Sequence, residues 1–263
     1  MKGRTALITG STGGLGLATA TALAAEGYNI VMTGLGDLKE VEVARQSIET
    51  THGVPVRYIA ADLQRPAEIE QMVAEARSVF GSIDVLVNNA VIRHFNAIEN
   101  FLPADWDQEI AVNLTAPFHL ARLTLGAMKA ANWGRIINLS SNTGIFAVPN
   151  RPGYVTTKTA LLGLTRAIAA ETLGTGITCN AICPSAMIGA NAEKGIARIM
   201  QEDGLSRDAA IEAFLAKRQR ARFVTTVPAL IVFLCGEGGK DMTGTTIPVD
   251  LGSTAGQREA LNP

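Results

Sequence analysis

Several residue types are scarce in this chain of 263 residues, and each shortage excludes a class of protein. The three cysteines, Cys179, Cys183 and Cys235, are odd in number and widely spread, which fits neither a disulfide framework nor a metal site. No other group of His, Cys and carboxylate residues has metal-ligand spacing, so we predict no metal. Charged residues make up only 18% and the net charge is −1, which argues against disorder and against nucleic acid or an anionic membrane as a partner.

Long hydrophobic runs are also missing. No stretch approaches the roughly 20 uninterrupted apolar residues of a membrane span. The Ala-rich segment 17–25 resembles the apolar core of a signal peptide, but cleavage after it would remove the glycine-rich turn that precedes it. We therefore expect this segment to be a helix, and we expect a cytoplasmic protein.

Apolar residues make up 47% of the chain, and short apolar runs alternate with helix-length segments. The expected strands are Arg4–Thr9, Asn29–Thr33, Val56–Ala60, Ile83–Val87, Arg135–Leu139, Ile177–Ile182 and Thr245–Val249. The expected helices are Leu15–Glu26, Leu38–Thr51, Pro66–Phe80, Asp105–Ala131, Gly153–Leu173 and Thr226–Cys235. Continuous apolar strands suit a parallel sheet that helices cover on both faces. We predict an α/β fold, a doubly wound, seven-stranded parallel sheet of the Rossmann type.

Residues 185–225 break this rhythm after the sixth strand. They contain two helical patterns, at about 190–201 and 206–216. Because ligands bind at the carboxyl ends of the strands in such sheets, an insertion there predicts a lid. We expect one domain over residues 1–255, lid included, and a tail over 256–263.

A glycine-rich turn, in which Gly10, Gly14 and Gly16 recur, lies between the first strand and the first helix. Glycines let the main chain approach a pyrophosphate, and the helix N-terminus offers it N–H groups. No cation stands in this turn or in residues 34–37, where Leu35 is expected beside the adenosine ribose. This favours NAD over NADP. Asp37 is either a ribose ligand or a solvated acid, and Asp62 is placed to meet the adenine edge.

Tyr154 and Lys158 are four residues apart on an expected helix and therefore share one face. A free tyrosine titrates near pH 10, and an adjacent ammonium favours its phenolate form. Such a pair can move a proton near neutrality. Ser141 ends the fifth strand, where its hydroxyl can hold a substrate oxygen. Asn113 lies inside a helical pattern, where a polar residue could either bend the helix or hold a water.

Together these motifs, with Asn88-Asn89-Ala90 at the end of the fourth strand, resemble the short-chain dehydrogenase/reductase family from residue 3 to about 255. The resemblance implies an oxidoreductase in which Tyr154 is the general acid/base, Ser141 stabilises the reacting oxygen and Lys158 assists Tyr154 and holds the nicotinamide ribose. It implies that Asn113 holds a water linked to Lys158. It also implies a homotetramer and an NAD site formed by Gly10, Thr12, Gly14, Leu15, Gly16, Leu35, Asp62, Leu63, Asn89, Ala90, Val112, Tyr154, Lys158, Pro184 and Met187.

Within that family the chain is similar to bacterial D-3-hydroxybutyrate dehydrogenases. The similar stretches are residues 22–27, 34–37, 61–63, 134–138, 176–184 and 223–225, and the lid region 204–214. The substrate-binding positions differ from that subfamily and are here Arg93, Thr143, Arg151, Ala186, Gly195 and Ser253. Because an arginine offers a forked donor to an anion, Arg93 and Arg151, with Thr143, are our candidate substrate-binding residues. We expect a small anionic substrate, a hydroxy acid related to 3-hydroxybutyrate and not identical with it.

Three alternatives remain open. The first is that the chain is a carbonyl reductase that acts on 3-oxoacyl or cyclic ketone substrates. The second is that the chain is an NAD-binding scaffold with little turnover. The supporting observation is that Val91, Ser185 and Gly189 differ from the residues that the resemblance implies beside the nicotinamide. His94 either faces the substrate or packs within its loop.

Overall fold

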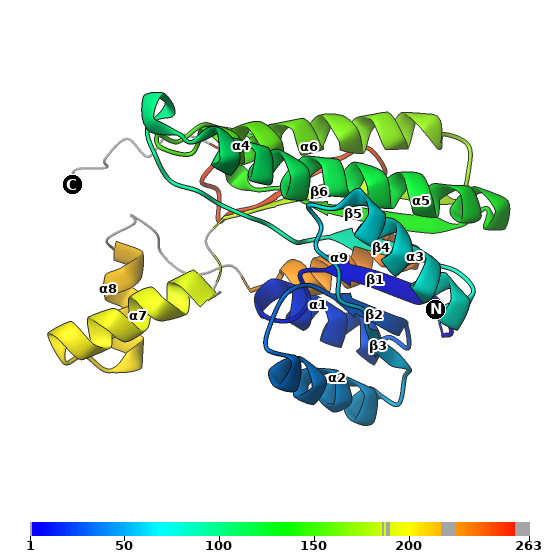
Figure 1. Ribbon diagram of the computed structural model, residues 1–263, viewed down its shortest axis with the longest axis horizontal. Helices are drawn as coiled ribbons and strands as arrows, with labels where there is room; N and C mark the ends of the chain where they lie inside the picture. The colour runs from blue at the N-terminus through cyan, green and yellow to red at the C-terminus, as the bar shows by residue number, and fades with distance from the viewer. Residues whose placement is uncertain (1, 186, 188–189, 217–224, 256–263) are drawn as a thin grey trace.

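A parallel sheet of seven strands forms the centre of the structure, a computed structural model that describes residues 2–185, 187, 190–216 and 225–255 (Figure 1). The strand order is β3-β2-β1-β4-β5-β6-β7, and every neighbouring pair is parallel. The strands are β1 (Thr5–Thr9), β2 (Asn29–Thr33), β3 (Val56–Tyr58), β4 (Val85–Asn88), β5 (Gly134–Leu139), β6 (Ile177–Pro184) and β7 (Thr246–Val249). The predicted fold class is confirmed. The strand order reverses between β1 and β4, which opens a crevice at the carboxyl ends of the strands.

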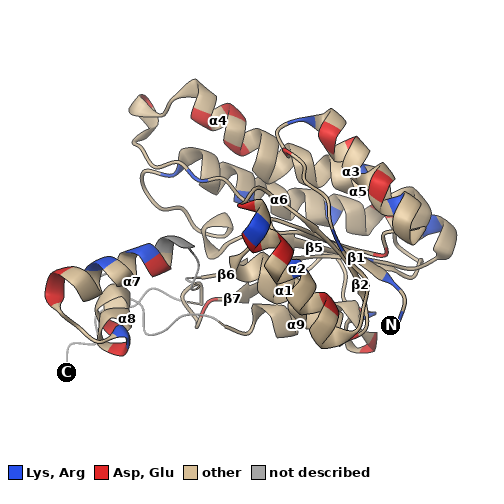
Figure 2. Ribbon diagram, turned by 60° about the horizontal axis from the view of Figure 1, so that its bottom comes forward, with Lys and Arg blue, Asp and Glu red and all other residues tan. Residues whose placement is uncertain are grey.

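Helices cover both faces of this sheet. On one face lie α1 (Gly14–Ala25), α2 (Leu38–His52) and α9 (Val227–Cys235), and on the other lie α3 (Pro66–Phe80), α5 (Ala116–Ala131) and α6 (Pro152–Glu171) (Figure 1). Alternate strand residues enter the two layers: Leu7 packs with α3 and α5, whereas Ala6 and Ile8 pack with α1 and α9. Both faces are therefore buried, which explains the continuous apolar strands. Figure 2 shows charged residues on the helices, whereas the strands are mostly free of them.

The prediction of one continuous α-helix over residues 105–131 is wrong. Helix α4 (Pro103–Ile110) passes through a π-helical turn, η2 (Ala111–Thr115), before α5 begins. The turn places the Asn113 side chain against the main chain of Ile92, to which it is bonded in both directions at 2.9 Å. Pro117, which has no N–H to donate, stands in the first turn of α5. Such π turns are frequent at functional sites.

Two helices stand apart from the sheet. They are α7 (Ala190–Asp203) and α8 (Arg207–Ala216), which pack against each other around Ile196, Ile199 and Phe214 (Figure 1). Their bounds agree closely with the two helical patterns expected in the lid. The remaining short helices are η1 (Ile98–Asn100), η3 (Asn142–Gly144) and η4 (Glu237–Gly239). Among the helices of the described residues, none combines the length and apolar character that a membrane crossing needs.

Candidate active site

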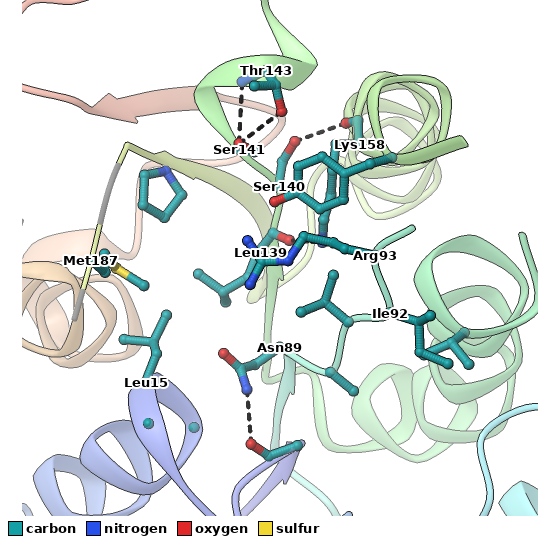
Figure 3. A pocket seen from close by; sticks show the side chains of 18 of the residues that line it. Leu15, Asn89, Ile92, Arg93, Leu139, Ser140, Ser141, Thr143, Lys158 and Met187 are labelled. Carbon is teal, nitrogen blue, oxygen red and sulfur yellow. Dashed lines mark hydrogen bonds between the residues drawn. The ribbon is translucent and has the colours of Figure 1, made fainter. Parts of the chain in front are cut away.

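A cleft of about 1020 Å³ lies at the carboxyl ends of the strands (Figure 3). It brings together residues that are far apart in the sequence. Every residue that we predict to bind the cofactor lines it, namely Gly10, Thr12, Gly14, Leu15, Gly16, Leu35, Asp62, Leu63, Asn89, Ala90, Val112, Tyr154, Lys158, Pro184 and Met187. Ser141 and the substrate candidates Arg93, Thr143 and Arg151 line the same cleft.

The glycine turn forms one end of the cleft, and its shape depends on two close approaches of the main chain. A Cβ at Gly16 would lie 2.2 Å from the carbonyl oxygen of Gly10, and a Cβ at Gly10 would lie 2.9 Å from the Cα of Ala90. The Asn89 side-chain amide stabilises the turn by donating hydrogen bonds to the carbonyl oxygens of Thr9 and Gly10, at 2.8 and 3.1 Å. Larger residues at positions 10 and 16 would push this turn away from β4.

The same turn presents open main chain to the cleft. A Cβ at Gly13 or Gly14 would meet nothing within 4 Å. Gly13 caps helix α1 without a side-chain hydrogen bond, and the first turn of α1 contains no acidic residue. The N–H groups of that turn therefore remain available to an anion, and the helix dipole favours a negative charge there. This open cradle fits the pyrophosphate of a dinucleotide.

The end of the cleft where we expect the adenosine lies around Leu35. Leu35 is 73% exposed, and its carbonyl oxygen accepts a 3.0 Å hydrogen bond from the Thr12 hydroxyl. Asp37, one candidate for the ribose, instead caps α2 by accepting from the N–H groups of Lys39 and Glu40. Among the described residues that line this end, none is a lysine or arginine, and the one charged residue is Asp62.

Tyr154 and Lys158 lie on α6 at the opposite end of the cleft. The Lys158 ammonium donates to the carbonyl oxygen of Leu139 at 2.7 Å and lies 5.8 Å from the centroid of the Tyr154 ring. Lys158 is 2% exposed. Burial, together with the positive charge of Arg93, lowers the pKa of Lys158 to about 7. The two side chains are therefore buried and close together.

Ser141 follows β5, and its hydroxyl is surrounded by polar neighbours. It accepts hydrogen bonds from the N–H and the hydroxyl of Thr143 at 3.2 and 3.0 Å, and donates to the Asn142 amide oxygen at 3.3 Å. The Asn142 amide group donates in turn to Ser253, whose hydroxyl donates to Asp250 at 2.9 Å. A chain of contacts thus runs from Ser141 to the loop after β7.

The end of the cleft where we expect the substrate holds two arginines. The Arg93 guanidinium lies 5.6 Å from the centroid of the Tyr154 ring, and Figure 3 shows its side chain reaching into the middle of the cleft between Lys158 and Asn89. The Arg151 guanidinium stacks over the Phe95 ring at 4.8 Å. The cations among the described lining residues, Arg93, Arg151 and Lys158, all lie at this end. An anion would be favoured here.

Some predicted residues lie elsewhere. Asn113 is buried beside the cleft and holds the main chain of Ile92. His94 does not line the cleft, and its Nδ1 lies 3.4 Å from Asp105. Gly195 faces Phe214 within the α7–α8 pair, and Ala186 and Gly189 lie outside the described residues. Within the described part of the chain, no three His, Cys, Asp or Glu residues gather as a metal site.

Sequence reasoning missed two residues near the cleft. Glu109 is completely buried on α4, and burial raises the pKa of its carboxyl. In the sequence, Glu109 lies between Asp107 and an apolar turn, so the pattern predicts one more exposed acid near the start of a helix. Asn142 was missed because its partner Ser253 is distant in the chain.

The comparisons with known proteins agree with this geometry. Residues 4–198 match the family model of the short chain dehydrogenases, and the chain therefore belongs to that family of oxidoreductases, which bind a nicotinamide cofactor. It is 42% identical over 259 residues, 97% of this chain and 99% of the relative, to the D-beta-hydroxybutyrate dehydrogenase of Cupriavidus necator. It is 34% identical over 251 residues, 95% and 97%, to a 3-oxoacyl-(acyl-carrier-protein) reductase of Staphylococcus aureus. Among solved structures, L-sorbose reductase from Gluconobacter frateurii, complexed with NADPH and L-sorbose, matches with a TM-score of 0.87, 28% identity and 95% and 96% coverage.

Proposed function

We propose that the chain transfers a hydride between NAD(H) and a small anionic hydroxy acid or its keto form, related to 3-hydroxybutyrate and not identical with it. One observation carries the proposal: the Arg93 guanidinium stands 5.6 Å from the ring of Tyr154, in a cleft whose cations gather at that end. A carboxylate bound by Arg93 would hold its neighbouring carbon and oxygen beside Tyr154. The similarity to a D-beta-hydroxybutyrate dehydrogenase supports a hydroxy acid.

The side chains near Tyr154 support a mechanism of proton transfer. A bound nicotinamide would supply or accept the hydride. Tyr154 would give the proton to, or take it from, the reacting oxygen, and the Lys158 ammonium, fixed by Leu139, would stabilise the phenolate. The Ser141 proton faces Asn142 across a long 3.3 Å contact, which a substrate oxygen could replace. Asn113 would hold a water in the proton path, as the family resemblance implies.

We propose NAD in preference to NADP on the charges at the adenosine end. A 2′-phosphate needs a cation, and the described residues that line this end, with Leu35 at their edge, provide none. The L-sorbose reductase of Gluconobacter frateurii was solved in complex with NADPH, so the test measures the cofactor preference on this chain itself. The experiment is a titration of NADH and NADPH fluorescence with the purified protein. Equal affinity for the two would contradict the proposal.

The substrate is tested by following NADH absorbance with a panel of hydroxy acids, including 3-hydroxybutyrate and dicarboxylic hydroxy acids. We expect turnover of a hydroxy acid that Tyr154→Phe abolishes, and weaker turnover of 3-hydroxybutyrate itself. Ordinary efficiency with 3-hydroxybutyrate would contradict the changed substrate. A protein that binds NAD tightly and turns over nothing would instead be the NAD-binding scaffold, for which Val91 at the cleft wall is the supporting observation.

A second candidate function is the reduction of 3-oxoacyl or cyclic ketone substrates. The size of the cleft and the similarity to a 3-oxoacyl reductase favour it. Adding 3-oxoacyl thioesters and cyclic ketones to the same panel, with NADH as the reductant, distinguishes it. Faster reduction of a neutral cyclic ketone than of any keto acid would favour this candidate.

We further propose that residues 1–255 act as one domain in a cytoplasmic homotetramer, with 185–225 as a lid. Ala192 of α7 and Phe214 of α8 line the cleft, which supports the lid. The long helices α5 and α6 are the candidate contact surfaces between subunits. Light scattering in solution should give four times the mass of the chain, and a monomer would contradict this part of the proposal. Cell fractionation tests the cytoplasmic location.

A further inference from the structure

The buried acid Glu109 has no part in the mechanism above. Its side chain is 0% exposed on α4, and burying a carboxylate is costly unless it is bonded. One oxygen, Oε1, accepts the main-chain N–H of His94 at 2.5 Å. The other, Oε2, has no hydrogen-bond partner among the described residues. A carboxylate is therefore kept in the protein interior beside the segment that carries Arg93.

Glu109 acts together with Asn113, which follows it by four residues along α4 and η2. Asn113 binds the main chain of Ile92 in both directions, and Glu109 binds that of His94. Two residues further, the Asn96 N–H donates to the carbonyl oxygen of Asn150 at 3.1 Å. The main chain of segment 92–96 is therefore held at every second residue.

The residues between these anchors are the ones that reach the substrate end. Arg93 and Phe95 both line the cleft, Arg93 toward the Tyr154 ring and Phe95 beneath the Arg151 guanidinium. Segment 92–96 belongs to no helix or strand, so no ladder of main-chain bonds fixes it. The position of Arg93 therefore depends on the contacts at Ile92 and His94.

The opposite side of Glu109 faces the start of α6. A Cβ at Gly153 would lie 2.7 Å from Oε2 of Glu109, so only a glycine leaves the carboxylate in place. Gly153 directly precedes Tyr154. Glu109 is thus packed between the segment that carries Arg93 and the helical turn that carries Tyr154.

We propose that Glu109 is a positioning residue that fixes the Arg93 guanidinium relative to Tyr154 and so sets the affinity for the anionic group of the substrate. The inference rests on the proposed function for the identity of the substrate. The clamp itself, a carboxylate on the His94 N–H, is a feature of the folded chain and can be tested without turnover.

The experiment compares Glu109→Leu, which removes the acceptor, with Glu109→Gln, which keeps an amide oxygen in its place. Asp105→Asn is the matched control, because it weakens the contact to the His94 ring and leaves the Glu109 acceptor in place. We measure KM for the hydroxy acid, KM for NAD, and hydrogen exchange of the amides of 91–97. Glu109→Leu should raise the hydroxy-acid KM about tenfold, the size expected for losing one hydrogen bond to a charged group, and should leave the NAD KM unchanged.

The exchange measurement separates this inference from the proposed function. Amides of 91–97 should exchange faster in Glu109→Leu than in Glu109→Gln or Asp105→Asn, while those of β1 stay protected. Unchanged exchange, or equal rises in both KM values, would overturn the clamp. A wild-type protein that oxidises no hydroxy acid would overturn the proposed function. If Glu109→Leu does not fold, Gly153→Ala displaces the carboxylate and should accelerate exchange in the same segment; unchanged exchange there would overturn the clamp as well.

Discussion

The two ends of the cleft are built in different ways. The glycine turn at the cofactor end gets its shape from main chain packed against main chain, as in the approach of Gly16 to Gly10. At the substrate end, Arg93 stands on an irregular segment that hydrogen bonds to the buried side chains of Asn113 and Glu109 hold in place. The first arrangement tolerates little change and can serve one invariant ligand group. The second can be altered one side chain at a time, which suits a part of the site that selects the substrate.

The largest expected effect lies at Tyr154, at the substrate end of the cleft. Phenylalanine there removes only the hydroxyl, so the ring that faces Arg93 remains. We expect kcat to fall by about a thousandfold, within the range for loss of a general acid/base. NADH absorbance measures the rate, and fluorescence titration of NADH should show unchanged binding. Residual activity within tenfold of wild type would assign the proton transfer to another group.

A pair of glycine variants tests the cofactor end. In Gly16→Ala the new methyl group would lie 2.2 Å from the Gly10 oxygen. We therefore expect the free energy of unfolding, measured in a denaturant titration, to fall by about 2 to 3 kcal/mol. Gly13→Ala meets nothing in the protein and has an extended main chain that any residue adopts, so its stability should match wild type. Its methyl group would stand in the open cradle, and we expect NADH to bind about tenfold more weakly. Normal NADH affinity in Gly13→Ala would mean that the dinucleotide does not lie along this turn.

The sequence could predict the cofactor end better than the substrate end for a physical reason. The glycine turn is local, and its spacing between a strand and a helix determines its conformation within seven residues. The same holds for Tyr154 and Lys158, which helical geometry puts on one face. The alternation of strands and helices then determines that these pieces meet at one sheet edge.

The parts that could not be predicted depend on contacts between distant segments. Nothing near Glu109 in the sequence indicates that it is buried against His94 and Gly153. The sequence indicates that Asn113 could bend its helix, but it does not indicate a π turn in which the Asn113 side chain binds the main chain of Ile92 on another segment. Asp37 had two interpretations, and the structure uses it as a helix cap.

At the substrate end, Arg93→Ala removes the cation nearest to Tyr154. We expect the hydroxy-acid KM to rise by about ten- to a hundredfold, since a charge-assisted contact is lost, while NAD binding is retained. Arg93→Lys should recover only part of the affinity, because an ammonium lacks the fork that matches a carboxylate. Steady-state kinetics with both variants measure this. An unchanged KM in Arg93→Ala would shift the anion site to Arg151.

Lys158 is expected to make the free energy of unfolding depend on pH. Its pKa of about 7 in the folded chain lies below the ordinary value of 10.5, so between these values the unfolded chain binds more protons and stability rises with pH. From pH 7 to 8.5 we expect a gain on the order of 1 kcal/mol in the free energy of unfolding, measured in urea. Lys158→Met should lack this gain, and the difference between the two proteins removes the contribution of other groups. In Arg93→Ala the rise should begin at higher pH, because the neighbouring charge is gone. Equal slopes in wild type and Lys158→Met would contradict a buried, depressed lysine.

The smallest expected effect concerns the contact chain from Ser141 to the loop after β7. Ser253→Ala removes the partner of the Asn142 amide, a 3.3 Å bond at an exposed residue, so we expect kcat/KM to fall only two- to threefold, roughly the value of one ordinary hydrogen bond. Asn142→Ala should cost at least as much, since it also breaks the contact to Ser141. If the loop acts on Ser141 through Asn142, the double variant should be no worse than Asn142→Ala alone, whereas multiplied losses would mean that the two residues act separately. Ser78→Ala on the exposed side of α3 is the control and should leave kcat/KM unchanged. A non-additive result would show that Ser141 depends, through the Asn142 amide, on Ser253 in the loop after β7.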